Sequence, residues 1–133
     1  MRSKIFLFLL ILFAFKANSQ FHIGDSTVQV MLDVVQDKNC SEPMMLENSI
    51  YWTNYATNSD YFAFYNLRKR IFKLVVNPKA RENFNVFIKV FETKYMRNNV
   101  GEWFAVENGK AYLIKTTYDP ESVLKYVITY TKL

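Results

Sequence analysis

The chain has 133 residues, half of them hydrophobic and 17% aromatic, with 17 basic against 12 acidic side chains. This length suits one domain, and three glycines and three prolines are too few for a disordered linker or a low-complexity segment. One histidine and one cysteine exclude a metal cage of histidine and cysteine ligands within a single chain, so we predict no metal site and no cofactor.

An export signal is predicted at the start of the chain. The apolar run 5–15 follows Arg2 and Lys4, and its 11 residues are few for a membrane-spanning helix, which needs roughly 20. Segment 17–19 carries the small residues that a signal peptidase reads. We therefore predict that residues 1–19 are a cleaved signal peptide, that the protein is periplasmic or secreted, and that it keeps no stable membrane insertion. An uncleaved N-terminal anchor is the alternative.

Charge and cysteine content restrict the partners. The predicted cleavage removes Arg2, Lys4 and Lys16. The mature chain then has 14 of the 17 basic residues and 12 acidic residues, which gives a net charge of +2. So small a charge argues against nucleic acid as a partner. Cys40, the single cysteine, cannot form an internal disulfide. A buried, inert thiol is favoured over an exposed thiol or a bridge to another chain.

A helix is predicted after the turn residues 24–26. Ser26 and Gln29 have the spacing of a capping box, in which the serine side chain caps the helix. The apolar residues that follow recur at i, i+3, i+4 and i+7, the pattern of a helix with a single apolar stripe. These residues are Val28, Met31, Leu32 and Val35.

Three strands are predicted next, over residues 50–56, 61–66 and 70–76, with short turns between them. Alternate residues of a strand point to opposite faces of a sheet. We assign the even positions to the core, namely Ile50, Trp52, Phe62, Phe64, Phe72, Leu74 and Val76. The odd positions then form an amphipathic face that carries Tyr51, Tyr55, Tyr61 and Tyr65.

A second helix is predicted from Asn77, as its N-cap, and Pro78, as its first residue. Its apolar stripe consists of Phe84, Phe87, Ile88, Phe91 and Tyr95. Three further strands are predicted over residues 102–107, 110–117 and 123–131. The dipeptide Asn108-Gly109 is a strong signal for a hairpin turn between the first two.

The element order α-β-β-β-α-β-β-β, with short turns, predicts a two-layer α+β fold. Its sheet is mostly antiparallel, and the two helices lie on one face. Residues 20–133 make a single domain, which can be divided into a pseudo-repeat of 23–76 and 77–133.

Catalytic residues are not predicted. The sequence contains no glycine-rich phosphate loop, nucleophile elbow or zinc-protease helix motif. His22 lies close to the predicted new terminus, where a solvated or packed histidine is favoured over a functional one. We therefore expect a protein that is not an enzyme. An enzyme whose site forms only in an oligomer is the less favoured class.

The basic run Arg68–Arg70 is the densest charge feature of the chain. It predicts either a soluble hairpin tip or a contact for an acidic partner, flanked by Tyr65 and Phe72. Together with the tyrosine-bearing face, it gives the candidate partner-binding residues Tyr51, Tyr55, Tyr61, Tyr65, Arg68, Lys69 and Arg70.

The helix after Ile23 and Gly24, the aromatic strand with Trp52 and Tyr55, and the runs "YFAFYN" and "RIFKLVV" resemble one α+β module of the beta-lactamase-inhibitor-protein-like and SmpA/OmlA-like group. The resemblance covers residues 23–76. It implies a small exported protein that binds another protein through an aromatic sheet face. We therefore predict a binding module of the inhibitor, immunity or envelope-assembly type. The alternative is a small-ligand carrier with an aromatic pocket between the second helix and the sheet.

Overall fold

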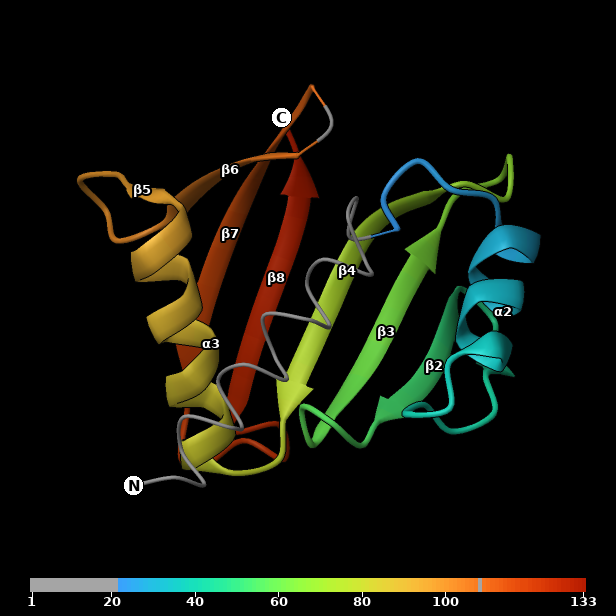
Figure 1. The fold of residues 1–133 in the computed structure, drawn as a ribbon, viewed down its shortest axis with the longest axis horizontal. Coiled ribbons are helices and arrows are strands. Elements are labelled where there is room, and N and C mark those ends of the chain that lie inside the picture. The colour runs from blue at the N-terminus through green and yellow to red at the C-terminus, as the bar shows by residue number, and fades with distance from the viewer. Residues whose placement is uncertain (1–21, 108) are drawn as a thin grey trace.

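The computed structural model describes residues 22–107 and 109–133, which form two helices and one eight-stranded sheet (Figure 1). The predicted signal peptide lies outside these residues. Neither described helix has the length and apolarity needed to cross a membrane. The elements in chain order are α2 (Thr27–Gln36), β1 (Met44–Met45), β2 (Ser49–Asn54), β3 (Ser59–Tyr65), β4 (Ile71–Pro78), α3 (Arg81–Lys94), β5 (Met96–Arg97), β6 (Trp103–Glu107), β7 (Lys110–Tyr118) and β8 (Tyr126–Lys132).

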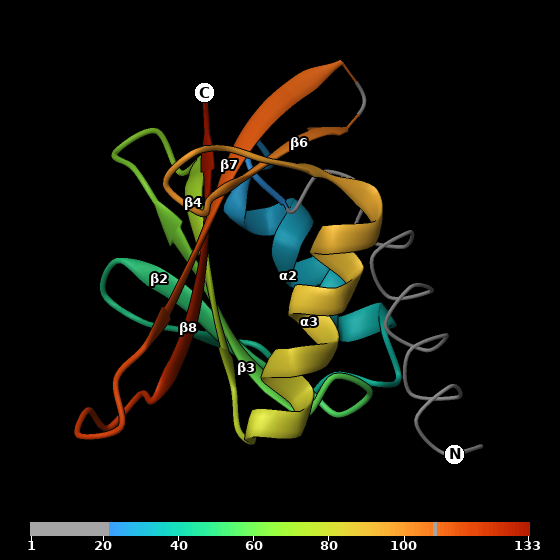
Figure 2. The ribbon, with the colours of Figure 1, turned by 90° about the vertical axis from the view of Figure 1, so that its left-hand side faces the viewer.

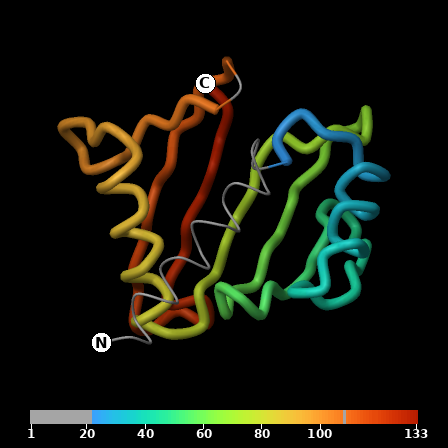
Figure 3. Tube along the Cα trace, viewed as in Figure 1, coloured from blue at the N-terminus to red at the C-terminus, as the bar shows by residue number. Residues whose placement is uncertain are grey.

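The sheet has the strand order β1-β2-β3-β4-β8-β7-β6-β5, and every neighbouring pair is antiparallel. Each half of the described chain is a helix followed by four strands, and the halves meet where β4 pairs with β8 (Figure 3). This confirms the predicted α+β fold. The structure adds the two-residue strands β1 and β5 at the edges, and such short edge strands leave little backbone for pairing with another sheet.

Both helices lie on one face of the sheet, and the opposite face carries neither (Figure 2). α2 packs beside β2, and α3 lies over β6 to β8. Between α3 and the sheet, the ring of Phe91 lies 5.4 Å from that of Trp103 and 6.1 Å from that of Tyr130. Fully burying a large apolar side chain stabilises a fold by about 1.5–3 kcal/mol, so this aromatic layer is a main source of stability.

The first turn of α2 forms as predicted. Ser26 is the N-cap, and its Oγ accepts a hydrogen bond of 3.1 Å from the Gln29 backbone N–H. The Gln29 side chain does not close the capping box. Its Nε2 donates instead to Asp33 Oδ1, one turn further along the helix, at 2.8 Å.

Apolar side chains occupy two sides of α2. The side that packs on the sheet carries Val30 and Val34, and Met31 is partly buried beside them. The other members of the predicted stripe are more than half exposed, so the prediction of one stripe is wrong for Val28, Leu32 and Val35. Helical spacing fits two overlapping stripes in this apolar sequence, and spacing alone does not distinguish them.

α3 begins at Arg81 and not at the predicted cap. Asn77 and Pro78 both pair with β3, so β4 continues through the two residues that were expected to start the helix. The predicted apolar stripe of α3 is confirmed. Phe87 and Phe91 are fully buried, and the other three members are partly buried against the core.

The turn between β6 and β7 joins paired residues Glu107 and Lys110. Gly109 has a φ of 75°, in the region that favours glycine, as the hairpin signal predicts. Asn108, the other residue of that signal, lies outside the described residues.

Strand register decides which residues share a face. Trp52 on β2 lies opposite Tyr61 on β3, and Ala63 on β3 lies opposite Leu74 on β4. Directly opposed residues point to the same face, so the core face takes even positions from β2 and β4 but odd positions from β3. The assignment of all even positions to the core is therefore wrong in part. It misplaces Phe62 and Phe64 on β3. It also misplaces Phe72, because a shift in the β3–β4 register at the start of β4 leaves Ile71 buried and Phe72 exposed.

Candidate functional site

The face of the sheet opposite the helices is the candidate functional site, and we call it the open face (Figure 2). Cross-strand pairs place its central residues in two adjacent rows. The first row, from β3 to β6, is Phe64, Lys73, Thr131, Leu113 and Phe104. The second row, from β2 to β7, is Tyr51, Phe62, Val75, Thr129 and Lys115.

The centre of the open face is incompletely buried, with aromatic and aliphatic side chains on either side of Lys73, Thr131 and Thr129. The rings of Tyr51 and Phe62 lie 5.1 Å apart, and Lys73 Nζ lies 4.5 Å from the centre of the Phe64 ring. All four side chains are half-buried, and Phe104 is 43% exposed. The two rows therefore form one continuous patch that a partner could cover.

At one end of the open face, the negative charge of Asp60 is neutralised by interactions within the chain. Tyr51 Oη and Thr53 Oγ1 donate hydrogen bonds of 3.1 and 2.7 Å to Asp60 Oδ1. Lys79 Nζ lies 3.6 Å from the same oxygen. The carboxylate of Asp60 thus has donors and a cation within the chain and does not need a partner.

The other end is compensated in the same way. Lys115 Nζ lies 3.3 Å from Glu102 Oε2, and Asn98 Nδ2 donates to Glu102 Oε1 at 3.1 Å. The hydrogen bond from Asn98, followed by the interaction with Lys115, lowers the pKa of Glu102. With both ends paired, the open face offers a partner its aromatic and aliphatic side chains and the charge of Lys73.

The four predicted tyrosines do not share a face. Tyr51 lies on the open face, whereas Tyr61 is in the core, 8% exposed and stacked on Trp52 with ring centroids 5.4 Å apart. Burial raises the pKa of Tyr61 well above its ordinary value. The predicted grouping is wrong because odd positions of β2 lie on the same face as even positions of β3.

Tyr55 and Tyr65 lie away from the centre of the open face. Tyr55 follows β2 in a turn and is 65% exposed, with its backbone N–H bonded to Asn39 O at 2.7 Å. Tyr65 follows a shift in the β3–β4 register. Its hydroxyl donates to the carbonyl oxygens of Leu46 and Glu47 at 2.9 Å, which fastens the loop before β2.

The basic run forms the tip between β3 and β4, and its side chains have separate contacts. Lys69 Nζ lies 4.8 Å from the centre of the Tyr65 ring. Arg70 Nη1 donates to Gly24 O, before α2, at 3.4 Å. Of the predicted partner-binding residues, the structure thus brings Tyr65 and Lys69 into contact, but it does not join Arg68 or Arg70 to the tyrosines in one surface.

Sequence reasoning missed the aromatic residues that form the centre of the open face. The signal that could have found them is the turn length between β2 and β3. Asn54 pairs with Ser59 across a turn of four residues. A turn with an even number of residues always places even positions of one strand opposite odd positions of the next. For the hairpin of β2 and β3, this rule places Phe62 and Phe64 on the same face of the sheet as Tyr51.

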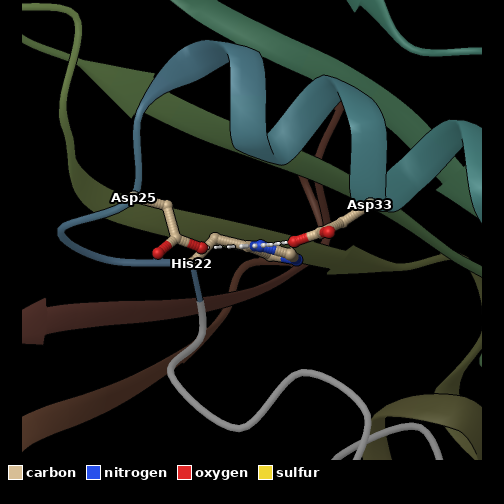
Figure 4. Close-up of side chains that lie close together, drawn as sticks. All are labelled: His22, Asp25 and Asp33. Carbon is tan, nitrogen blue, oxygen red and sulfur yellow. Dashed lines mark ion pairs between the residues drawn. The ribbon is translucent and has the colours of Figure 1, made fainter.

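A separate cluster of side chains able to bind a metal lies where the chain enters α2 (Figure 4). His22 Nδ1 lies 3.5 Å from Asp25 Oδ2 and 4.0 Å from Asp33 Oδ2. The three ligand atoms all lie within 4.8 Å of one another. Within residues 22–107 and 109–133, no other group of three histidine, cysteine or acidic side chains meets this spacing.

The space between α3 and the sheet, where the carrier alternative predicts a pocket, is filled by aromatic rings. Phe87 and Phe91 are fully buried there, and Phe91 packs on Trp103. A pocket of about 260 Å³ lies instead beside α2, where Val34 and Cys40 are among its lining residues. Nothing in this packing favours a ligand carrier.

No protein-family model matches the chain, and neither the curated proteins nor the solved structures contain a match. The candidate function therefore depends on the geometry of the open face.

Proposed function

We propose that this protein is a non-enzymatic binding module that holds another protein against its open face. The observation that carries the proposal is the unbroken row from Phe64 to Phe104, which crosses five strands on a face that neither helix covers. The row is mixed, since Lys73 and Thr131 lie between its apolar members, and protein interfaces commonly have such a mixed composition. Aromatic side chains supply much of the binding energy at such contacts.

The width of the open face suits a protein better than a small molecule. Its central residues extend over six neighbouring strands, from Tyr51 on β2 to Phe104 on β6. Neighbouring strands lie about 4.8 Å apart, so this patch is roughly 24 Å across. A small molecule would cover only part of it, whereas a protein surface can cover it whole.

The charge on the open face indicates what the partner presents. Lys73 lies on β4, one of the two central strands. A symmetric dimer with its axis through the middle of the face would bring two copies of Lys73 together, and like charges oppose such a contact. We therefore expect a different protein, with an apolar surface and a carboxylate placed to face Lys73.

The proposal includes export. It follows the predicted signal peptide, residues 1–19, and the resemblance to small exported modules of the inhibitor, immunity or envelope-assembly type. N-terminal sequencing of the native protein tests this part, with a first residue at or near Gln20 expected. An intact Met1 recovered with the membrane fraction would contradict it.

The binding proposal is tested by paired substitutions of apolar surface residues with lysine. Phe104→Lys and Leu113→Lys change the open face, whereas Val28→Lys changes the exposed side of α2, where Val28 is 66% exposed. Each purified variant is used to capture proteins from an envelope extract, with circular dichroism as the check on folding. We expect a partner that the wild type and Val28→Lys retain and that both open-face variants lose.

Titration of the captured protein then gives the energetic measure. Truncating a contact at the centre of an interface weakens binding by about 2 kcal/mol or more, and we expect this loss for Phe64→Ala. A partner that binds both open-face variants as tightly as the wild type would contradict the proposal. Capture of a second copy of this chain alone, sensitive to the same variants, would replace it with self-association.

A further inference from the structure

We propose that His22, Asp25 and Asp33 bind a divalent transition-metal cation of the Zn²⁺ class. His22 and Asp25 come from the turn before α2, and Asp33 comes from α2 itself (Figure 4). It combines one imidazole nitrogen with two carboxylate oxygens, a ligand set that proteins use for zinc. The prediction of no metal site considered cages of histidine and cysteine, and this set needs no cysteine.

The distances between the three ligand atoms fit coordination of a shared ion better than direct hydrogen bonds between the side chains. His22 Nδ1 is 3.5 and 4.0 Å from the nearest oxygens of Asp25 and Asp33, whereas N–H···O bonds measure about 2.7–3.2 Å. Zinc lies about 2.0–2.2 Å from nitrogen and oxygen ligands, so tetrahedral ligands are roughly 3.4 Å apart. The three ligand atoms lie within 4.8 Å of one another, so the side chains would move closer together on binding.

The burial of the imidazole is a second, independent observation. The His22 side chain is 6% exposed, and its ring lies edge-on to Trp52 at 5.8 Å. In the part of the chain that the structure describes, it makes no hydrogen bond. Nδ1 points towards the carboxylates of Asp25 and Asp33, and coordination of a cation would give this nitrogen a direct partner.

The backbone holds the ligands in place before any ion binds. Gly24 N–H donates to Ile71 O at 2.8 Å, Ile71 N–H donates to Asp25 O at 2.9 Å, and Asp25 N–H donates to His22 O at 3.0 Å. These bonds tie the turn before α2 to strand β4. The site is thus built on the sheet, and little ordering is left for a cation to impose.

Asp33 is oriented by a neighbour. Gln29 Nε2 donates to its Oδ1 at 2.8 Å, which leaves Oδ2 as the oxygen nearest to His22. Outer hydrogen bonds of this kind orient ligating carboxylates in metal sites. The glutamine that was expected to complete the capping box thus supports the cluster instead.

The charge of the cluster also suits a cation. Among the described residues, no lysine or arginine lies within ion-pair distance of Asp25 or Asp33. The nearby Arg70 donates to the carbonyl oxygen of Gly24 and not to either carboxylate. The side chains of Asp25 and Asp33 are 26% and 40% exposed, so an ion can reach them from solvent.

The ligand set also selects among metals. Calcium prefers 6–8 oxygen ligands, which three side chains with one nitrogen do not provide. For nitrogen and oxygen ligands, Zn²⁺ binds more tightly than Mn²⁺. Three protein ligands leave a position for water. The bound ion would link residue 22 to α2.

The test uses protein expressed from the full-length sequence and purified, after chelator treatment, through a tag without histidine. Isothermal titration with Zn²⁺, Mn²⁺ and Ca²⁺ measures affinity, and thermal unfolding measures stabilisation. We expect one Zn²⁺ per chain, weaker Mn²⁺ and still weaker Ca²⁺, and a higher melting temperature with Zn²⁺. His22 is the single histidine of the chain, so its imidazole nitrogens give an unambiguous nuclear magnetic resonance signal, and Zn²⁺ should shift Nδ1.

Variants separate the proposed ligands from other acidic groups. Asp33→Asn removes a half-exposed ligand with little risk to folding, and we expect it to weaken Zn²⁺ binding by about tenfold or more. Glu92→Gln on α3 is the matched control, since it removes an exposed helical carboxylate and should leave binding unchanged. The proposal is overturned if Zn²⁺ does not bind, if it binds without shifting Nδ1, or if Asp33→Asn binds as tightly as the wild type.

Discussion

The rings of Trp52 on β2 and Tyr61 on β3 stack with centroids 5.4 Å apart and planes 16° from parallel. Both side chains are buried in the core cluster that also contains Val30 and Val34 of α2. Such aromatic pairs contribute about 0.5–1.5 kcal/mol beyond the burial of their area. The same register turns Tyr51 and Phe62 to the open face, so the core pair and the candidate site depend on one strand alignment.

Truncation of Tyr61 is expected to damage the fold. Tyr61→Ala removes a buried aromatic side chain and should lower the free energy of unfolding by roughly 3–5 kcal/mol. Tyr55→Ala is the control, because Tyr55 is 65% exposed, and it should cost about 1 kcal/mol or less. Urea unfolding followed by circular dichroism measures both. Equal losses for the two variants would contradict the placement of Tyr61 in the core.

The two sides of α2 should differ in the same way. Val30 is fully buried and Val28 is 66% exposed. Val30→Ala should lower the free energy of unfolding by about 2 kcal/mol, since it removes two buried methyl groups and leaves a cavity. Val28→Ala, the same chemical change on the exposed side, should stay within about 0.5 kcal/mol of the wild type. The reverse order would show that the predicted stripe packs on the core after all.

Local sequence signals predicted the elements of this fold but not all of their orientations. The cap at Ser26 was predictable because it depends on residues within one helical turn. The packed side of α2 was not, because Val28 and Val30 both fit an apolar stripe and only contact with β2 selects between them. Likewise, Asn77 has the chemistry of a helix cap, but pairing with β3 keeps it in a strand.

The candidate site depends on longer-range relationships. Phe64 on β3 and Phe104 on β6 lie in one row only because the intervening strands β4, β8 and β7 pair in matching register. No local pattern specifies that β4 pairs with β8. Similarly, His22 and Asp33 are 11 residues apart in the sequence. They meet because the turn before α2 is bonded to β4.

Alkaline titration should reveal the buried tyrosines. Burial raises the pKa of the buried Tyr61 and Tyr130 well above the ordinary value of 10.0. Partial burial does the same for Tyr95, where a hydrogen bond to the Glu107 carboxylate adds to the effect. The fold thus favours their neutral forms. The stability that they contribute is fully present below pH 10.0 and is lost as the pH rises above it.

We therefore expect these three tyrosines to ionise only together with unfolding. Near-ultraviolet absorbance reports tyrosinate, and circular dichroism on the same samples reports the fold. Tyr61→Phe should reduce the late rise in absorbance by one tyrosine, provided that the variant folds. Ionisation of all nine tyrosines while the circular dichroism is still native would contradict the burial on which the prediction depends.

Cys40 should be a poor nucleophile in the folded protein. Burial, followed by the charge and hydrogen bonding of Asp37, raises the pKa of its thiol to about 12. The reactive thiolate is therefore scarce at mildly alkaline pH, and alkylation by iodoacetamide should be at least about tenfold slower than in urea-unfolded protein. Asp37→Asn should speed alkylation only in part, because burial is the larger cause, and Glu92→Gln should not change it.

The stability linked to this thiol is present below pH 9.0 and is lost as the pH rises towards 12. Rapid alkylation of the folded protein, or a reducible dimer needed for its stability, would instead make Cys40 an exposed, reactive group.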